Sequence, residues 1–134
     1  MTKRMLVFVV VGMGLAMSGA GAFGHHAFSA EFDANKPVKM TGTVTSVEWR
    51  NPHTWFYLDV GDASGNVVNW GFELASPNLL LRNGWTRSSM KVGDVVVVEA
   101  YQAKNGSSIA NAHVVTLTST GKTLFTGSSK GTTP

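Results

Sequence analysis

Apolar and polar positions alternate one by one in residues 54–60, and this period is typical of a half-buried β-strand. The residues expected on its inward face are Thr54, Phe56, Leu58 and Val60. The opposite face carries aromatic rings and polar tips, at Trp55, Tyr57 and Asp59. The Asn51-Pro52 dipeptide before this strand is a turn signal, because proline excludes the preceding residue from the helical region. A corner followed by a strand is therefore predicted here.

Four further segments have the composition of strands, namely 38–49, 67–74, 95–101 and 109–117. In the first of these, Val44 and Val47 are three residues apart, so they can share a face only if the strand carries a bulge near residues 45–46.

The register between the strands at 54–60 and 67–74 also follows from the alternation. If both apolar faces are turned to the core, Phe56 must pair with Phe72, and Leu58 with Trp70. A shift of one residue in this pairing would expose the Trp70 side chain to water.

The period changes at residues 76–84, which predict a helix of about two turns. Ser76 is a suitable N-cap, Pro77 suits the first helical position, and Gly84 ends the segment. We expect its leucines to cover one open end of a barrel.

Three strands, a helix and two strands is the order of an OB-fold. The predicted fold is therefore all-β: a small five-stranded OB-fold-like Greek-key barrel with one short helix between strands three and four. A β-sandwich is the competing architecture.

The N-terminus has the pattern of a secretory signal peptide, with a basic head, an apolar run at 5–17 and small residues after it. The apolar run is shorter than the roughly 20 residues that span a bilayer, so no membrane span is expected after cleavage. The domain organisation expected from the sequence is a signal peptide at 1–24, an N-terminal arm at 25–37, the barrel at 38–120 and a flexible C-terminal tail at 121–134. The expected localisation is periplasmic or secreted.

Removal of the predicted signal peptide would lower the net positive charge of the chain. The 134 residues include 11 basic and 8 acidic ones, and removal of Lys3 and Arg4 leaves 9 basic against 8 acidic. This weak charge argues against a nucleic-acid partner. The absence of cysteine excludes disulfides, thiolate chemistry and c-type haem attachment.

Small residues allow signal cleavage before Phe23 or before His25. A chain starting at Phe23 has histidine third, so its amine, two amides and the imidazole can form the square-planar set of nitrogens that Cu(II) prefers. A chain starting at His25 has an amine and an imidazole on one residue, with His26 beside it. The candidate metal ligands are therefore His25 and His26, with Cu(II) as the candidate cofactor. The simpler interpretation is that both histidines are only solvated.

Several short segments together resemble a family of exported bacterial proteins catalogued as domain of unknown function 6152. The segments that carry the resemblance are 25–33, 42–44, 48–49, 51–53, 76–78, 82–85 and 93–94. The resemblance supports an N-terminus close to the double histidine and implies little about activity. The architecture is also similar to that of periplasmic OB-fold stress proteins, which is a likeness of fold and does not transfer function.

The candidate ligand site is the rim of the predicted barrel, where OB-folds commonly bind. Its residues are Trp49, Asn51, His53, Trp55, Tyr57 and, from the third strand, Glu73. Aromatic rings would stack on a ligand, while His53 and Glu73 would orient it. In the alternative interpretation, Asn51 and His53 hydrogen-bond the turn and the tryptophans cover the barrel end. His113, alone in its strand, is interpreted as a surface residue.

The sequence contains neither a nucleophile motif nor a phosphate-binding loop, and a catalytic function is not expected. The predicted function is that of an exported, non-enzymatic binding protein for a small ligand or a periplasmic partner protein. The alternative is a copper-binding protein that uses His25 and His26. The sequence leaves the ligand, the partner and the oligomeric state open.

Overall fold

The structure is a computed structural model, and it describes residues 28–127. The chain divides into two compact units, Met1–Ala30 and Glu31–Pro134. The described residues of the first unit, 28–30, are helical. The predicted signal peptide and the two histidines of the candidate metal site lie outside the described residues.

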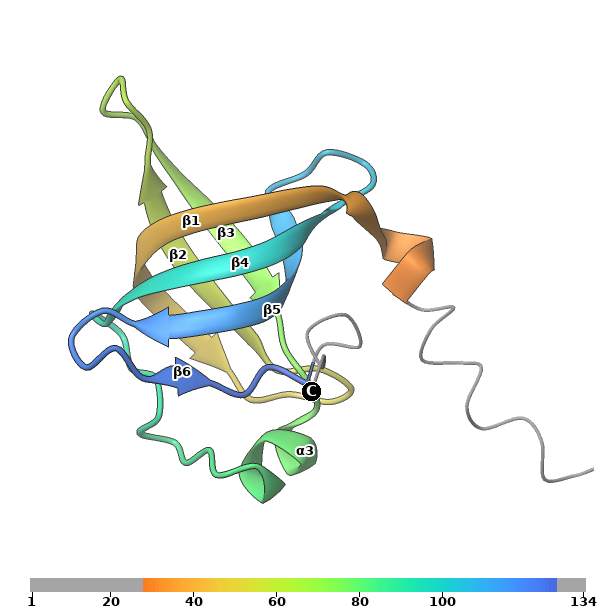
Figure 1. Cartoon of the computed structure of the whole chain (residues 1–134), viewed down its shortest axis with the longest axis vertical. Helices are drawn as coiled ribbons and strands as arrows, with labels where there is room; N and C mark the ends of the chain where they lie inside the picture. Colours follow the sequence, from red (N-terminus) through yellow and green to blue (C-terminus); the bar gives the residue numbers. More distant parts are fainter. Residues whose placement is uncertain (1–27, 128–134) are drawn as a thin grey trace, which may run out of the picture. The chain divides into compact units, whose positions relative to one another are not determined.

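The second unit is built mostly of β-strands, as the sequence predicts (Figure 1). Its strands follow the order β3-β2-β1-β4-β5-β6, with antiparallel neighbours, and β3 also pairs in parallel with β5. The elements are β1 (Phe32–Glu48), β2 (Trp55–Gly61), β3 (Val67–Glu73), α3 (Pro77–Arg82), β4 (Val95–Ala103), β5 (Ile109–Leu117) and β6 (Thr123–Leu124).

The predicted register of β2 and β3 is confirmed. Phe56 pairs with Phe72 and Leu58 pairs with Trp70. The rings of Phe56 and Phe72 are stacked with centroids 5.1 Å apart, and both side chains are fully buried. The inward face of this hairpin is therefore the centre of the core.

The bulge predicted in the first strand is also confirmed, because the register of β1 against β2 shifts between Val44 and Ser46. The strand is longer than the predicted 38–49, however. It begins at Phe32, so residues 32–37 of the predicted arm at 25–37 belong to β1. Phe32 is buried and pairs with Ala103, which extends the sheet beyond the proline. The register against β4 shifts between Phe32 and Pro37, and such irregularities are where a strand accommodates proline.

The C-terminal residues also differ from the prediction. Residues 121–134 were expected to form a flexible tail. Thr123 and Leu124 instead form β6 and pair with β5, while residues 128–134 lie outside the described residues. Leu124 is buried in the core cluster. Burial of Leu124 and the hydrogen bond from the Ala75 amide to the Thr126 carbonyl oxygen both hold the segment in place.

The helix α3 has the predicted caps. The Ser76 hydroxyl accepts a hydrogen bond from the Leu79 amide, and Gly84, after the helix, has a positive φ of 90°. Of the three leucines, only Leu80 is buried, while the other two are exposed. We expected the leucines of this helix to cover one open end of a barrel, but only one of the three is buried, because so short a helix can turn only one face inward.

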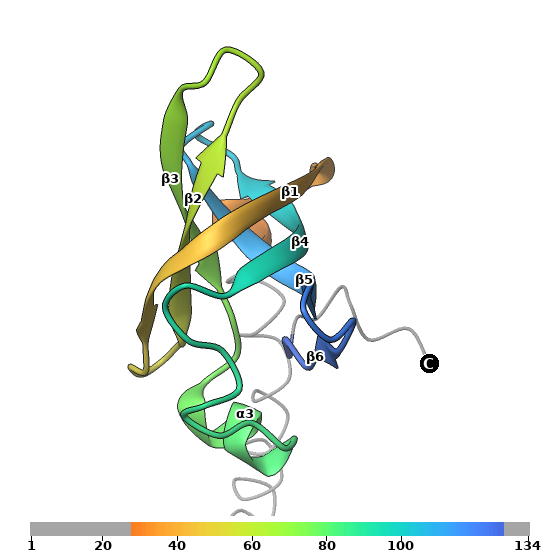
Figure 2. The ribbon, with the colours of Figure 1, turned by 90° about the vertical axis from the view of Figure 1, so that its left-hand side faces the viewer.

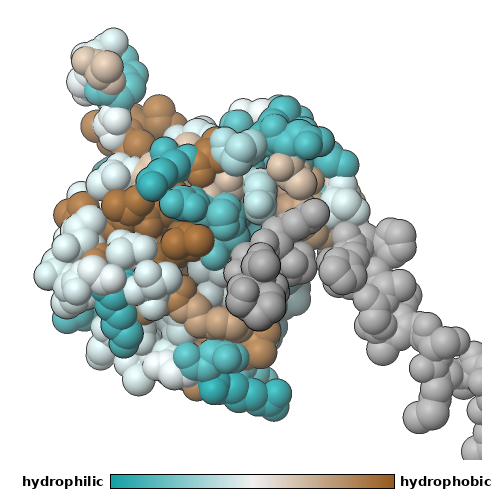
Figure 3. Space-filling model, viewed as in Figure 1, coloured by the Kyte–Doolittle hydropathy of each residue, from teal (hydrophilic) through white to brown (hydrophobic). Residues whose placement is uncertain are grey.

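The β2–β3 hairpin projects beyond the rest of the sheet, on the side away from α3 (Figures 1 and 2). Pairing of β1 with β2 stops at Asp59, and pairing of β5 with β3 stops at Gly71. The space-filling view shows the hairpin tip standing clear of the other side chains (Figure 3). Within residues 28–127, no helix has the length and apolar character needed to cross a membrane.

Gly42 lies where the pairing partner of β1 changes from β4 to β2, and there is no room for a side chain at this position. A Cβ atom there would lie 2.7 Å from the Asp59 carbonyl oxygen and 3.1 Å from the Leu58 Cβ. We expect Gly42→Ala to lower the free energy of unfolding by about 1–3 kcal/mol, because the backbone of β2 must move. The measurement is urea denaturation.

The matched control is Gly61→Ala on the projecting hairpin, where an added Cβ has no atom within 4 Å. This variant should be neutral or slightly stabilising, by up to about 1 kcal/mol. Equal stability of the two variants would show that the close approach at Gly42 does not constrain the fold.

Candidate functional site

Four side chains form a row across the outer face of β1, β2, β3 and β5. Glu48 is opposite Trp55, Trp55 is opposite Glu73, and Glu73 is beside Asn111. Paired residues on neighbouring strands have their side chains on the same face of the sheet. Since Phe56 and Phe72 point inward, this row points outward.

Trp55 and Tyr57 form what we call the aromatic pair. Their rings are stacked with centroids 6.5 Å apart and an angle of 25° between the ring planes, and both side chains are half-buried. Gly71 lies beneath them, and a Cβ atom there would be 3.1 Å from Tyr57 Cε1 and 3.7 Å from Trp55 Cε3. The missing side chain thus lets both rings lie close to β3. The result is a partly exposed aromatic surface on which a flat or apolar group can stack.

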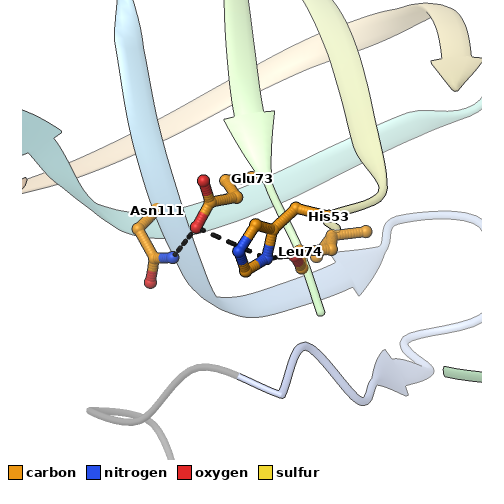
Figure 4. A network of polar contacts seen from close by, with 4 residues as sticks. All are labelled: His53, Glu73, Leu74 and Asn111. Carbon is orange, nitrogen blue, oxygen red and sulfur yellow. Dashed lines mark hydrogen bonds and ion pairs between the residues drawn. The ribbon is translucent and has the colours of Figure 1, made fainter. Parts of the chain in front are cut away.

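Next to the aromatic pair, Glu73, His53 and Asn111 form a polar group that we call the Glu73 cluster (Figure 4). The Glu73 side chain has its Oε1 atom 3.1 Å from Asn111 Nδ2, which donates a hydrogen bond to it. His53 Nδ1 lies 3.8 Å from the same oxygen. Glu73 is only 9% exposed, so its carboxyl group has little access to water.

The pKa of Glu73 is raised above its ordinary value of 4.5, and burial is the main cause. The nearby His53 charge and the Asn111 hydrogen bond both lower this pKa, and the charge of Glu31 raises it further. Burial disfavours the ionised carboxylate because it removes water from the charge. The site therefore contains a carboxyl group whose negative charge is incompletely compensated.

His53 connects the turn before β2 to the residue that follows β3. Its Nδ1 atom lies 3.1 Å from the Leu74 carbonyl oxygen, which can only accept a hydrogen bond. Nδ1 therefore carries the proton, and in the neutral ring Nε2 has the lone pair. The side chain is 43% exposed, so it can meet a ligand while it remains held at Nδ1.

The other predicted rim residues are not part of this arrangement. Trp49 packs edge-on against the buried Trp85, with ring centroids 5.9 Å apart, and Arg87 lies 4.6 Å above its ring. Trp85 in turn donates a hydrogen bond to the Phe125 carbonyl oxygen. Asn51 is exposed in the turn, before a cis peptide bond to Pro52. Of the six predicted site residues, the structure brings together His53, Trp55, Tyr57 and Glu73.

Sequence analysis missed Asn111, although one signal was available. Asn111 is a polar residue between Ala110 and Ala112 in a segment expected to form a strand, and it is buried. A polar side chain at such a position needs a partner. Its partner, Glu73, could not be identified, because the parallel pairing of β3 with β5 leaves no local pattern in the sequence.

The described residues contain no group of three or more histidine, cysteine, aspartate or glutamate side chains that could hold a metal ion. His113 stacks on Tyr101, with ring centroids 4.6 Å apart, as one expects of a residue that covers the outside of a strand.

The raised pKa of Glu73 has a consequence for stability. The folded protein keeps a proton on Glu73 over a pH range, starting near 4.5, in which the unfolded chain has released it. The contribution of Glu73 to the free energy of unfolding of the protein therefore falls as the pH rises through that range. The Glu73→Gln variant has no titrating group at this position. The free energy of unfolding of the wild-type protein minus that of the variant should therefore be larger at pH 4 than at pH 7. Urea denaturation at both pH values measures the difference.

Because His53 Nδ1 lies 3.8 Å from the Glu73 carboxyl, the comparison is repeated in a His53→Asn background. A wild-type-minus-variant difference that stays constant from pH 4 to pH 7 in both backgrounds would contradict the raised pKa.

The aromatic pair and the Glu73 cluster both lie in the part of the chain that one family model matches, residues 13–112. A comparison with curated proteins gives no match. The match spans most of the chain, so this protein belongs to the Family of unknown function (DUF6152).

Proposed function

We propose that this chain is an exported, non-enzymatic binding protein that holds a small ligand or a partner protein on its aromatic pair. The observation that carries the proposal is the position of two partly exposed rings, Trp55 and Tyr57, directly beside the buried carboxyl of Glu73. Binding sites typically combine apolar and aromatic surface with a few polar groups that fix orientation. The aromatic pair supplies the surface, and the Glu73 cluster supplies the polar groups.

The strand pairings support an OB-like barrel as the architecture behind this site. β1 pairs with β2 and β4, β3 pairs with β2 and β5, and β4 pairs with β5, so each of these five strands has at least two neighbours. The helix lies between strands three and four, as in that fold. OB-folds commonly bind ligands on the face of strands two and three, where the aromatic pair lies. This analogy supports the place of binding and says nothing of the ligand.

The proposed location is the periplasm or the exterior of the cell. The support comes from the sequence of residues 1–24, with its basic head, apolar run and small-residue cleavage sites.

Titration followed by NMR tests the binding function. The probes are maltose, choline and the dipeptide Gly-Trp, which represent a neutral sugar, an organic cation and an aromatic peptide. At least one probe should give saturable shifts of the Trp55 indole N–H and the Gly71 amide. The double variant His53→Ala, Trp55→Ala should bind that probe at least tenfold more weakly, a loss of about 1.4 kcal/mol.

The matched control is Trp49→Phe, which alters a tryptophan that packs on Trp85. This variant should bind the probe with unchanged affinity. The proposal fails if none of the probes shifts the Trp55 signal, or if the double variant keeps both its fold and its affinity.

A second candidate function, copper binding, is supported by His25 and His26, which lie at or close to the N-terminus after either predicted cleavage, before Phe23 or before His25. The chain exported to a bacterial periplasm and purified without a tag should have a mass that begins at Phe23 or His25. It should retain one Cu(II) in native mass spectrometry against competition from free histidine. One extra N-terminal residue should abolish tight binding, because the amine is then displaced from the imidazole. A different start, or an unchanged copper affinity in the extended protein, would exclude the terminal amine as a ligand.

A further inference from the structure

The indole of Trp55 lies between two carboxylate side chains. Glu48 of β1 is its register partner on one side, and Glu73 of β3 is its partner on the other. Directly opposed residues of antiparallel strands have Cβ atoms about 4.5–5.5 Å apart, so both carboxylates are within reach of the ring. An aromatic face attracts cations through its quadrupole, and carboxylates add direct Coulomb attraction. This combination favours a positively charged group over a neutral or negative one.

A cation of the protein itself already uses both attractions. The Arg50 guanidinium carbon lies 5.8 Å from the centroid of the Trp55 ring. The Arg50 Nη1 atom is 3.3 Å from Glu48 Oε2. Arg50 therefore shows which chemistry this part of the surface accepts.

Arg50 is held only loosely. Its distance from the Trp55 ring is close to the limit of about 6 Å for a cation–π contact. Its ion pair with Glu48 is exposed, with side chains that are 55% and 43% accessible, and such pairs contribute little to stability. By contrast, Arg87 lies 4.6 Å above the ring of Trp49. A ligand can therefore displace Arg50 at small cost.

Two further acidic side chains also favour a cation. Asp59 follows Trp55 and Tyr57 on the outer side of β2, and Glu31 is close enough to raise the pKa of Glu73. The pKa of Glu73 remains raised although His53 and Asn111 lower it, so its charge would gain from a further positive neighbour.

We propose that the ligand of this site carries an organic cation, an alkylammonium or guanidinium group, which replaces Arg50 against Trp55 between Glu48 and Glu73. Tyr57, stacked beside Trp55, extends the surface for an apolar or flat body attached to that cation. This inference rests on the proposed binding function and names the chemical class of its ligand.

The first test compares choline with 3,3-dimethylbutan-1-ol, a neutral molecule of nearly the same shape, by NMR titration of the full mature chain. Choline should give a saturable shift of the Trp55 indole signal and should bind at least tenfold more tightly than the neutral isostere. Its affinity should fall when sodium chloride is raised, because exposed charges are screened.

The second test uses variants that change the charge but leave the core intact. Arg50→Ala should bind choline at least threefold more tightly, because the internal cation no longer competes. Arg87→Ala removes the same charge beside Trp49 and should leave the affinity unchanged. Glu48→Gln should weaken choline binding without loss of the fold, since this side chain is partly exposed.

The outcomes separate this inference from the proposed function. Equal affinity for choline and its neutral isostere, or no difference between Arg50→Ala and Arg87→Ala, would overturn the cation site. If maltose saturates the Trp55 signal and choline does not, the binding function holds and the cation inference fails. If no probe acts at Trp55, both fail.

Discussion

The fold depends on the first strand pairing with two different neighbours. β1 pairs with β4 up to Thr43 and with β2 from Thr43 onward. The change of partner needs close backbone approach at Gly42 and the register shift between Val44 and Ser46. Because β1 bends in this way, the β2–β3 and β4–β5 hairpins come together and β3 meets β5. That last contact places Glu73 beside Asn111, so the candidate site is a consequence of the curvature of β1.

A single register builds both the core and the candidate site. Phe56 and Phe72 meet inside the sheet, and the same pairing brings Trp55 opposite Glu73 on the outside. Successive side chains of a strand point to opposite faces, so a slip of one residue would dismantle both arrangements together. Selection for a packed core therefore also preserves the geometry of the outer row.

The Glu73 cluster holds a carboxyl group where burial disfavours its charged form. Burial of a carboxyl group costs free energy unless hydrogen bonds and charges compensate it, and the raised pKa of Glu73 shows that compensation is incomplete. An apolar side chain would fill the same space at lower cost. In the proposed binding function, the neighbouring aromatic pair and the loosely held Arg50 give this carboxyl group a role in attracting a positively charged ligand.

The sequence by itself determined the features that depend on near neighbours along the chain. Alternation indicated which side of β2 and β3 is buried and hence their register, the spacing of Val44 and Val47 indicated the bulge, and Ser76 with Pro77 indicated the start of α3. It also placed Trp55, Tyr57, His53 and Glu73 among the candidate residues. Only the tertiary structure decided which side chains meet. Trp49 packs against Trp85, Asn111 donates a hydrogen bond to Glu73, and the strand that contains Leu124 pairs with β5. Periodicity reports the face on which a side chain lies, whereas its partner across the sheet depends on strand pairing between segments far apart in the chain.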